Sequence, residues 1–317
     1  MNTTQLIYLV FGIVLLVALV IDLGLISRKN HKIGLGTALI QTVFWVLLSL
    51  AFCGFIWYEK GKSDAISYLS AYLLEWSLSV DNIFVFILIF NFFKVEEIHY
   101  SRVLLMGILM AIIFRIVFIT IGSELVARFD WVMYIFGGFL VYTGFKILVA
   151  KGEDHFDPGN NWAFRFMKKF MRTTTAPHHG KFFIRINGKL FATILAMVVG
   201  MLGLIDIVFA VDSIPAVFSI IPDPRQRLLI YSSNIFAVLG LRSLFFLLHG
   251  AASRFSYLQH GVAIILIFIG LKMLVEHWMP IPIWASLMVI IVCIAGSILY
   301  SIFKMEEENN DVPKQIS

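Results

Sequence analysis

Four carboxylates inside strongly apolar runs are the residues of this chain whose types and spacing could do chemistry. They form two pairs, Glu75 with Asp81 and Asp206 with Asp212, and the members of each pair are six positions apart. Corresponding members of the two pairs are 131 residues apart. Because a carboxylate is costly to place in hydrocarbon, acids within a membrane normally serve a function. The pattern predicts a cation pathway built from two copies of one motif.

Further oxygen donors accompany these acids. Asn82 and Ser213 directly follow the second acid of each pair, and Asn234 lies in the next apolar run. Carboxylate, amide and hydroxyl oxygens suit hard divalent ions such as Mg²⁺, Ca²⁺ or Mn²⁺, whereas Zn²⁺ and Cu⁺ normally recruit cysteine or histidine. Cys53 and Cys293 form no Cys-x-x-Cys pair, so we expect small buried side chains there rather than redox or soft-metal chemistry.

The composition places these motifs in a multi-span membrane protein. Of the 317 residues, 60% are hydrophobic and only 14% are charged, far from the balance of a soluble domain. A span needs about 20 apolar residues, and nine segments qualify. They are Leu6–Ile26, Gly36–Tyr58, Ala65–Phe92, Val103–Gly122, Trp131–Ala150, Thr193–Ile220, Leu228–His249, His260–His277 and Ile283–Lys304. We therefore expect one all-α polytopic domain over residues 1–304 and a disordered tail over 305–317.

The distribution of basic residues predicts the orientation of these spans. With the amino terminus outside, the inside loops collect most of the lysines and arginines, including all eight basic residues of the segment Lys151–Lys189. The carboxyl terminus then lies inside. The first span is too long, and too poor in leading positive charge, for a cleavable signal peptide.

The long inside loop, residues 151–192, contains two predicted elements. Phe182–Phe191 alternates apolar and polar residues around Asn187-Gly188, which indicates a β-hairpin. Trp162–Met171 mixes aromatic and basic residues, which suits a short helix on the inner membrane face; a solvated linker is an equally good interpretation.

The repeat extends beyond the acids. Arg115 has a counterpart in Arg242, 127 residues later, and Lys146 has one in Lys272, 126 residues later. Residues of about 65–150 and 193–277 are therefore two copies of a three-span unit. Since three is odd, the second copy enters the membrane from the opposite side. Such inverted repeats are common in transporters, whose site lies at the repeat interface.

Eight ionisable residues recur in this repeat, and they must avoid lipid. At roughly 3 kcal/mol each, lipid-facing placement would cost on the order of 25 kcal/mol. We expect the two mid-span arginines to pair with acids, while Lys146 and Lys272 lie near span ends and can also snorkel. Four carboxylates and two arginines leave a charge of −2 for a divalent cation. Inward lysines would cancel this excess, and Asp22 would restore part of it.

Helix geometry limits how the acids converge. Six residues correspond to a rotation of about 240°, so two acids of one straight helix do not share a face. Convergence requires a local break, which Gly200, Gly203 and Pro215 could provide in the second motif, or a site wedged between crossing helices.

The motifs Glu75…Ser79-Val80-Asp81-Asn82 and Asp206…Phe209-Ala210-Val211-Asp212-Ser213-Ile214-Pro215-Ala216, followed by Tyr231–Ala237, resemble those of the TerC family of tellurite-resistance membrane proteins. The nine spans and the hairpin are similar to its Alx-type, pH-regulated branch, over roughly Leu6 to Lys304. The resemblance implies manganese export from the bacterial cytoplasm across the inner membrane. The ion ligands that it implies are Glu75, Asp81, Asn82, Asp206, Asp212 and Asn234.

Several functions stay open. A Mn²⁺ exporter is favoured, with proton antiport as a simple coupling because protons and metal compete for carboxylates. A Ca²⁺/H⁺ exchanger uses the same physics, and a non-transporting assembly factor for membrane proteins would dock through the inside loop. An intramembrane aspartyl protease is disfavoured because neither Tyr-Asp nor Gly-x-Gly-Asp occurs. Without a phosphate-binding loop, direct ATP coupling is not expected. We expect no enzymatic activity and no cofactor; the expected partners are a divalent metal ion and lipid, not nucleic acid.

Overall fold

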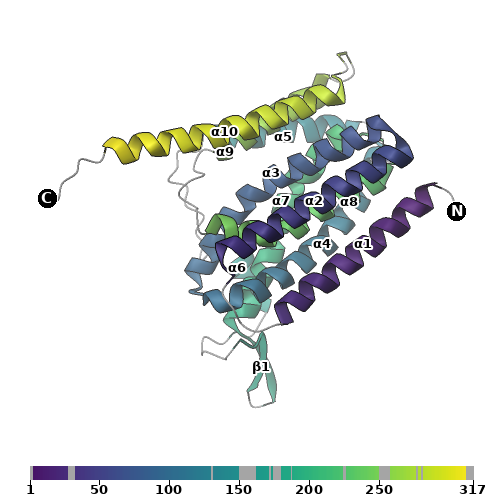
Figure 1. The fold of residues 1–317 in the computed structure, drawn as a ribbon. Helices are drawn as coiled ribbons and strands as arrows, with labels where there is room; N and C mark the ends of the chain where they lie inside the picture. Colours follow the sequence, from purple (N-terminus) through teal and green to yellow (C-terminus); the bar gives the residue numbers. More distant parts are fainter. Residues whose placement is uncertain are drawn as a thin grey trace.

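The fold is a bundle of long helices with a small hairpin at one end (Figure 1). It is known from a computed structural model, which describes residues 3–27, 33–129, 131–149, 162–170, 173, 180–186, 188–223, 226–249, 258–275, 278–279 and 281–311. The helices are α1 (Thr3–Ser27), α2 (Leu35–Lys60), α3 (Lys62–Phe92), α4 (Glu97–Arg128), α5 (Trp131–Val149), α6 (Trp162–Phe170), α7 (Ile194–Ile220), α8 (Arg227–His249), α9 (Leu258–Val275) and α10 (Ile283–Asp311). The strands are β1 (Phe183–Ile186) and β2 (Lys189–Ala192).

The long helices have the length and composition of membrane spans. Among the described residues, seven helices (α2, α3, α4, α5, α7, α8 and α10) are long and apolar enough to cross a bilayer. Shorter apolar stretches lie in α1 and α9, at Gln5–Ala18 and His260–Val275. The all-α, multi-span class is thereby confirmed. The total of nine spans and their orientation stay predictions.

The helices differ in how deeply they are buried, and α8 is central while other helices form a shell with apolar outer faces suited to lipid. The apolar stretch of α8 is 94% buried, because α2, α3 and α4 all pack against it. In contrast, α2, α5 and α10 expose large apolar side chains such as Leu47, Ile135 and Phe303. The end of α10 extends past the other helices (Figure 1). An apolar outer surface around a packed interior is what hydrocarbon requires.

Helices α4 and α7 run parallel. A Cβ atom added at Gly107 would lie 3.1 Å from Leu202, and one added at Gly122 would lie 2.8 Å from Phe218. Residue numbers therefore increase in the same direction along both helices. Helix α7 is continuous through Pro215. The local break considered for this segment is therefore absent, and its two acids keep the separate faces that a straight helix gives them.

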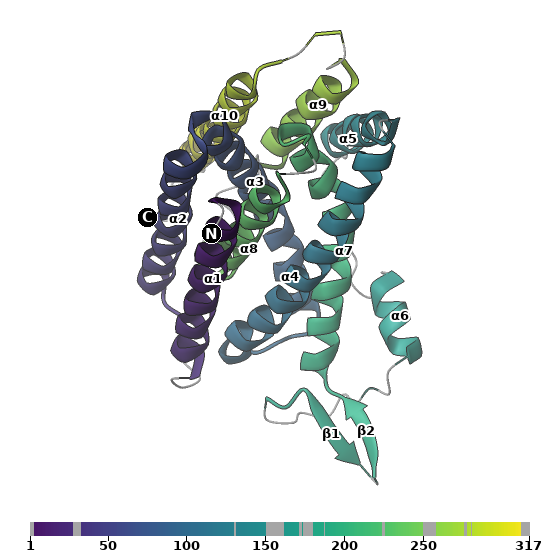
Figure 2. The ribbon, with the colours of Figure 1, turned by 90° about the vertical axis from the view of Figure 1, so that its right-hand side faces the viewer.

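The predicted hairpin and short helix are both present. Strand β1 pairs antiparallel with β2, with Ile186 opposite Lys189, and Gly188 adopts φ +76° in the turn. Helix α6 lies beside α7, and the hairpin projects beyond the start of α7 (Figure 2). Met167 of α6 fits against Gly200, where a Cβ would approach it to 2.2 Å.

Helices α5 and α9 make the closest contact in the shell, and they run antiparallel. A Cβ at Gly144 would lie 2.7 Å from the carbonyl oxygen of Ala263, and one at Gly270 would lie 2.6 Å from that of Gly137. Small residues let two helix backbones approach in this way, and a larger side chain would force them apart.

We expect Gly144→Leu to destabilise the protein by about 3 kcal/mol, the upper end of typical overpacking costs. Gly138→Leu is the matched control, because Gly138 of the same helix has open space around its Cβ position. The measurement is the thermal unfolding midpoint of both variants in detergent. Equal midpoints would contradict the tight α5–α9 contact.

Candidate functional site

A fully buried arginine joins its own helix to three others at the centre of the bundle. The guanidinium of Arg115, from α4, donates from Nε to Asp206 Oδ2 at 3.4 Å and from Nη2 to Asp206 Oδ1 at 3.2 Å. Its Nη1 donates to Glu75 Oε1 of α3 and, at 2.6 Å, to Asn234 Oδ1 of α8. Arg115, Glu75 and Asn234 have no solvent-exposed surface, and Asp206 is 3% exposed. Four predicted site residues therefore form one cluster.

Every carboxylate oxygen in this cluster accepts a hydrogen bond. Glu75 Oε2 accepts from Asn234 Nδ2 at 3.0 Å, and the other three oxygens accept from Arg115. Two carboxylates and one guanidinium give the cluster a formal charge of −1. A buried ion pair of this kind is retained only with such saturated hydrogen bonding.

The four helices that carry these residues pack against one another in pairs. Glu75 lies midway along α3, which packs on α8, and Asp206 lies midway along α7, which packs on α4. A small cavity of about 10 Å³, room for roughly one water molecule, lies beside Asp206. It is lined otherwise by apolar side chains and by Gly107.

The acid that follows Asp206 has a different neighbour. Asp212 is half-buried and accepts a hydrogen bond at 3.3 Å from Thr143 Oγ1 of α5. Asn82 and Ser213 are buried, 4% and 2% exposed. The side chains of Asp81 and Asp22 lie outside the part of the chain that the structure describes.

The basic residues of the predicted repeat do not all face inward. Arg242 and Lys272 are each 2% exposed, and Lys272 Nζ donates to the carbonyl oxygen of Ser219 at 3.1 Å. Lys146 is exposed, which agrees with the snorkelling alternative and not with inward placement. It lies two positions beyond Gly144, roughly on the opposite side of α5 from the α9 contact, and so it points away from the bundle.

No ready-made metal cage is present in the described residues. They hold no group of three or more His, Cys, Asp or Glu side chains placed to bind one metal ion. Instead, Arg115 occupies the place between the two nearest carboxylates. Sequence reasoning did not identify Thr143, and no signal marks it, because one threonine in an apolar helix is ordinary.

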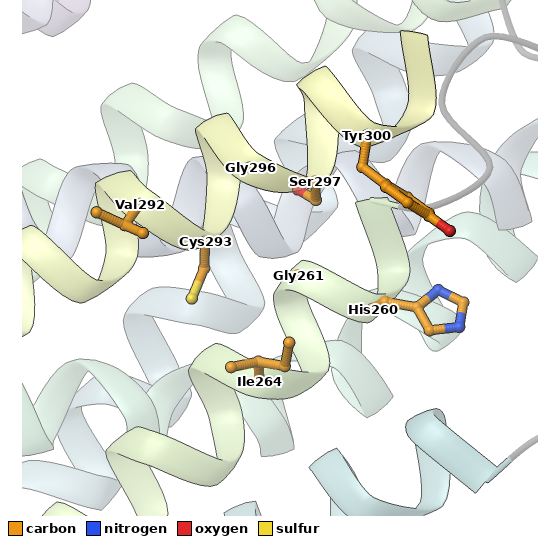
Figure 3. Close-up of a pocket in the computed structure, with 8 residues that line it drawn as sticks. All are labelled: His260, Gly261, Ile264, Val292, Cys293, Gly296, Ser297 and Tyr300. Atoms are coloured by element: carbon orange, nitrogen blue, oxygen red, sulfur yellow. The ribbon is translucent and has the colours of Figure 1, made fainter. Parts of the chain in front are cut away.

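A larger pocket lies away from the charged cluster. It has a volume of about 470 Å³ and opens between α9 and α10 (Figure 3). Its wall includes His260, Cys293, Gly296 and Tyr300, and it shares no residue with the Arg115 cluster. This groove is mostly apolar, as expected for a surface between membrane helices.

Comparison with known proteins gives a family for most of the chain. The model of the "Integral membrane protein TerC family" matches residues 60–309. The "Putative membrane-bound redox modulator Alx" of Escherichia coli (strain K12) is 42% identical over 301 residues, covering 92% of each chain. The "Uncharacterized membrane protein STKORF319" of Myxococcus xanthus is 38% identical, covering 93% of this chain and 92% of that one. No solved structure matches.

We expect Asn234→Ala to destabilise the protein by about 1–3 kcal/mol, because it leaves Glu75 Oε2 buried without a donor. Asn91→Ala is the control, since Asn91 is exposed at the end of α3. The test is thermal unfolding of both variants in detergent. An unfolding midpoint for Asn234→Ala equal to that of Asn91→Ala would show that the Asn234 hydrogen bonds contribute nothing net.

Proposed function

The chain belongs to the TerC family of integral membrane proteins, and on that premise we propose that it is a secondary transporter exporting a divalent metal ion, Mn²⁺, from the cytoplasm. The observation that carries this proposal is the buried cluster of Glu75, Asp206, Arg115 and Asn234. Ionisable groups at such a depth are rare and normally mark a pathway for substrate or ions.

An inverted-repeat transport mechanism is supported by how equivalent helices meet. In the proposed repeat, α3 to α5 correspond to α7 to α9. When each helix is replaced by its counterpart, the contact between α3 and α8 becomes the contact between α7 and α4, and both are present. Helix α5 packs against its own counterpart, α9. Gly144 and Gly270 occupy equivalent positions, and each abuts the other copy. Rocking of two such halves about a central site is the usual route to alternating access.

The surroundings of the cluster favour an occluded conformation. Towards the end of α3, the rings of Phe90 and Tyr100 stack with centroids 4.5 Å apart, and Phe245 packs against both. On the side of α8 that faces α1 and α2, the ring centroid of Phe52 lies 5.3 Å from that of Phe236 and 5.7 Å from that of Tyr68. These two aromatic groups, together with the complete burial of Arg115 and Glu75, keep the charges from water in this conformation.

The donor set and the family support the choice of ion. The candidate ligands, Glu75, Asp81, Asn82, Asp206, Asp212 and Asn234, offer only oxygen or amide groups, which suits Mn²⁺ and Ca²⁺ alike. Manganese is chosen over calcium because the motif resemblance implies it. Protons compete with metal for carboxylates, so we propose proton antiport as the coupling.

Some relatives are named as redox modulators, but this chain has no Cys-x-x-Cys pair for thiol–disulfide chemistry. Cys53 and Cys293 are its two cysteines, on α2 and α10, and both are free thiols. Disulfide exchange normally uses two neighbouring cysteines. The buried charges therefore make transport the better-supported proposal.

We expect Asp206→Asn to reduce Mn²⁺ flux into proteoliposomes at least tenfold, because it removes a proposed ligand and the bidentate partner of Arg115. Glu124→Gln is the control, since Glu124 forms a partly exposed ion pair with Arg128 at the end of α4. Flux is measured with and without a pH gradient. Unchanged flux in a folded Asp206→Asn protein would contradict the proposal.

Cells provide a test of ion identity. Bacteria lacking the protein should become sensitive to Mn²⁺ salts, and the native chain but not Asp206→Asn should restore tolerance. Sensitivity to Ca²⁺ instead would favour the exchanger. Loss of function on deleting 162–171, with full function in Asp206→Asn, would favour the assembly factor.

A further inference from the structure

Arg115 already occupies the position that a transported cation needs. It donates four hydrogen bonds, one to Glu75, one to Asn234 and two to Asp206. Together with Asn234, it uses every oxygen of both carboxylates. A metal ion that bridges Glu75 and Asp206 would have to take the place of this guanidinium, because both positive groups need the position between the two carboxylates.

We propose that Arg115 is a tethered competitor of the transported ion, and that this competition makes the site select divalent over monovalent cations. The inference rests on the proposed function of the same site. At this site, displacement of the Arg115 guanidinium must accompany metal binding, and its return must accompany metal release.

The selectivity follows from charge. When a monovalent ion replaces the guanidinium between Glu75 and Asp206, the positive charge facing the carboxylates stays at +1, and the four hydrogen bonds of Arg115 are given up. A divalent ion brings +2 to the same two carboxylates, and in a low-dielectric interior that extra charge strengthens the attraction steeply. Sodium or potassium therefore gains nothing by displacing Arg115, while a divalent ion does.

An arginine is suited to this role for two reasons. Its guanidinium stays protonated at any physiological pH, so the competitor cannot be switched off by losing a proton. It is also fixed to α4, so its effective concentration at the carboxylates is high whenever the ion leaves. The empty carrier then never holds two buried carboxylates without a counter-charge, a state that a low-dielectric interior strongly disfavours.

The test is Mn²⁺ binding to the purified full-length protein in detergent, measured by calorimetry at constant ionic strength in choline chloride and in sodium chloride. We expect Arg115→Gln to bind Mn²⁺ at least tenfold more tightly in choline than the native protein does. Sodium should weaken binding to Arg115→Gln at least threefold and leave the native protein unchanged. Arg128→Gln, an exposed arginine of the same helix, is the control and should behave as native.

Arg115→Lys tests the same idea if Arg115→Gln fails to fold. It keeps one positive charge but provides a less extensive hydrogen-bonding group, so we expect tightening of threefold or more. Native-like or weaker Mn²⁺ binding in a folded Arg115→Gln or Arg115→Lys, beside measurable binding by the native protein, overturns the inference and leaves the proposed function standing. Absence of Mn²⁺ binding in the native protein and all variants overturns both.

Discussion

The structure depends on neutralising one arginine in the middle of an apolar bundle. A buried guanidinium costs several kcal/mol even after relaxation, and only well-placed partners offset that cost. Here the partners come from three other helices: Glu75 from α3, Asp206 from α7 and Asn234 from α8. Because none of these contacts is local in sequence, the arginine couples the packing of α3, α4, α7 and α8. Any movement of one of these helices against the others must break or exchange bonds to Arg115.

The shell follows a simpler constraint. The outer helices need only a packed inner face and an apolar outer face, so they can be held by close backbone contact instead of polar bonds. The α5–α9 pair shows this, with Gly144 and Gly270 each lying against the partner backbone. Polar bonds between shell and core are present as well, from Thr143 of α5 to Asp212 and from Lys272 of α9 to the Ser219 carbonyl oxygen, but they lie apart from the Arg115 cluster.

Much of this arrangement follows from the sequence, and the failures have identifiable causes. The apolar segments, the hairpin at Asn187-Gly188 and the pairing of Arg115 with acids were all predictable from composition and spacing. The environments of Lys146 and Lys272 were not, although both follow the same Gly-x-Lys pattern. Helix α9 also packs against α10, and among the described helices α5 has no equivalent neighbour, so equal motifs have unequal surroundings. Pro215 likewise looked like a break, but α7 continues through it.

The two acids of the charged cluster also have different surroundings. In the proposed repeat, Asn234 corresponds to Gly107, with the same 127-residue offset that relates Arg242 to Arg115. The two residues have opposite effects. Asn234 binds Glu75 and closes off its free oxygen, whereas Gly107 makes room for Leu202 and for the small cavity beside Asp206. One carboxylate is therefore sealed by an amide, and the other adjoins a cavity of roughly the volume of one water molecule. Two symmetric acids would hold Arg115 equally, but this pair does not. In the proposed competition between Arg115 and the ion, the bidentate bonds from Arg115 to Asp206 are therefore the ones that lie next to open space.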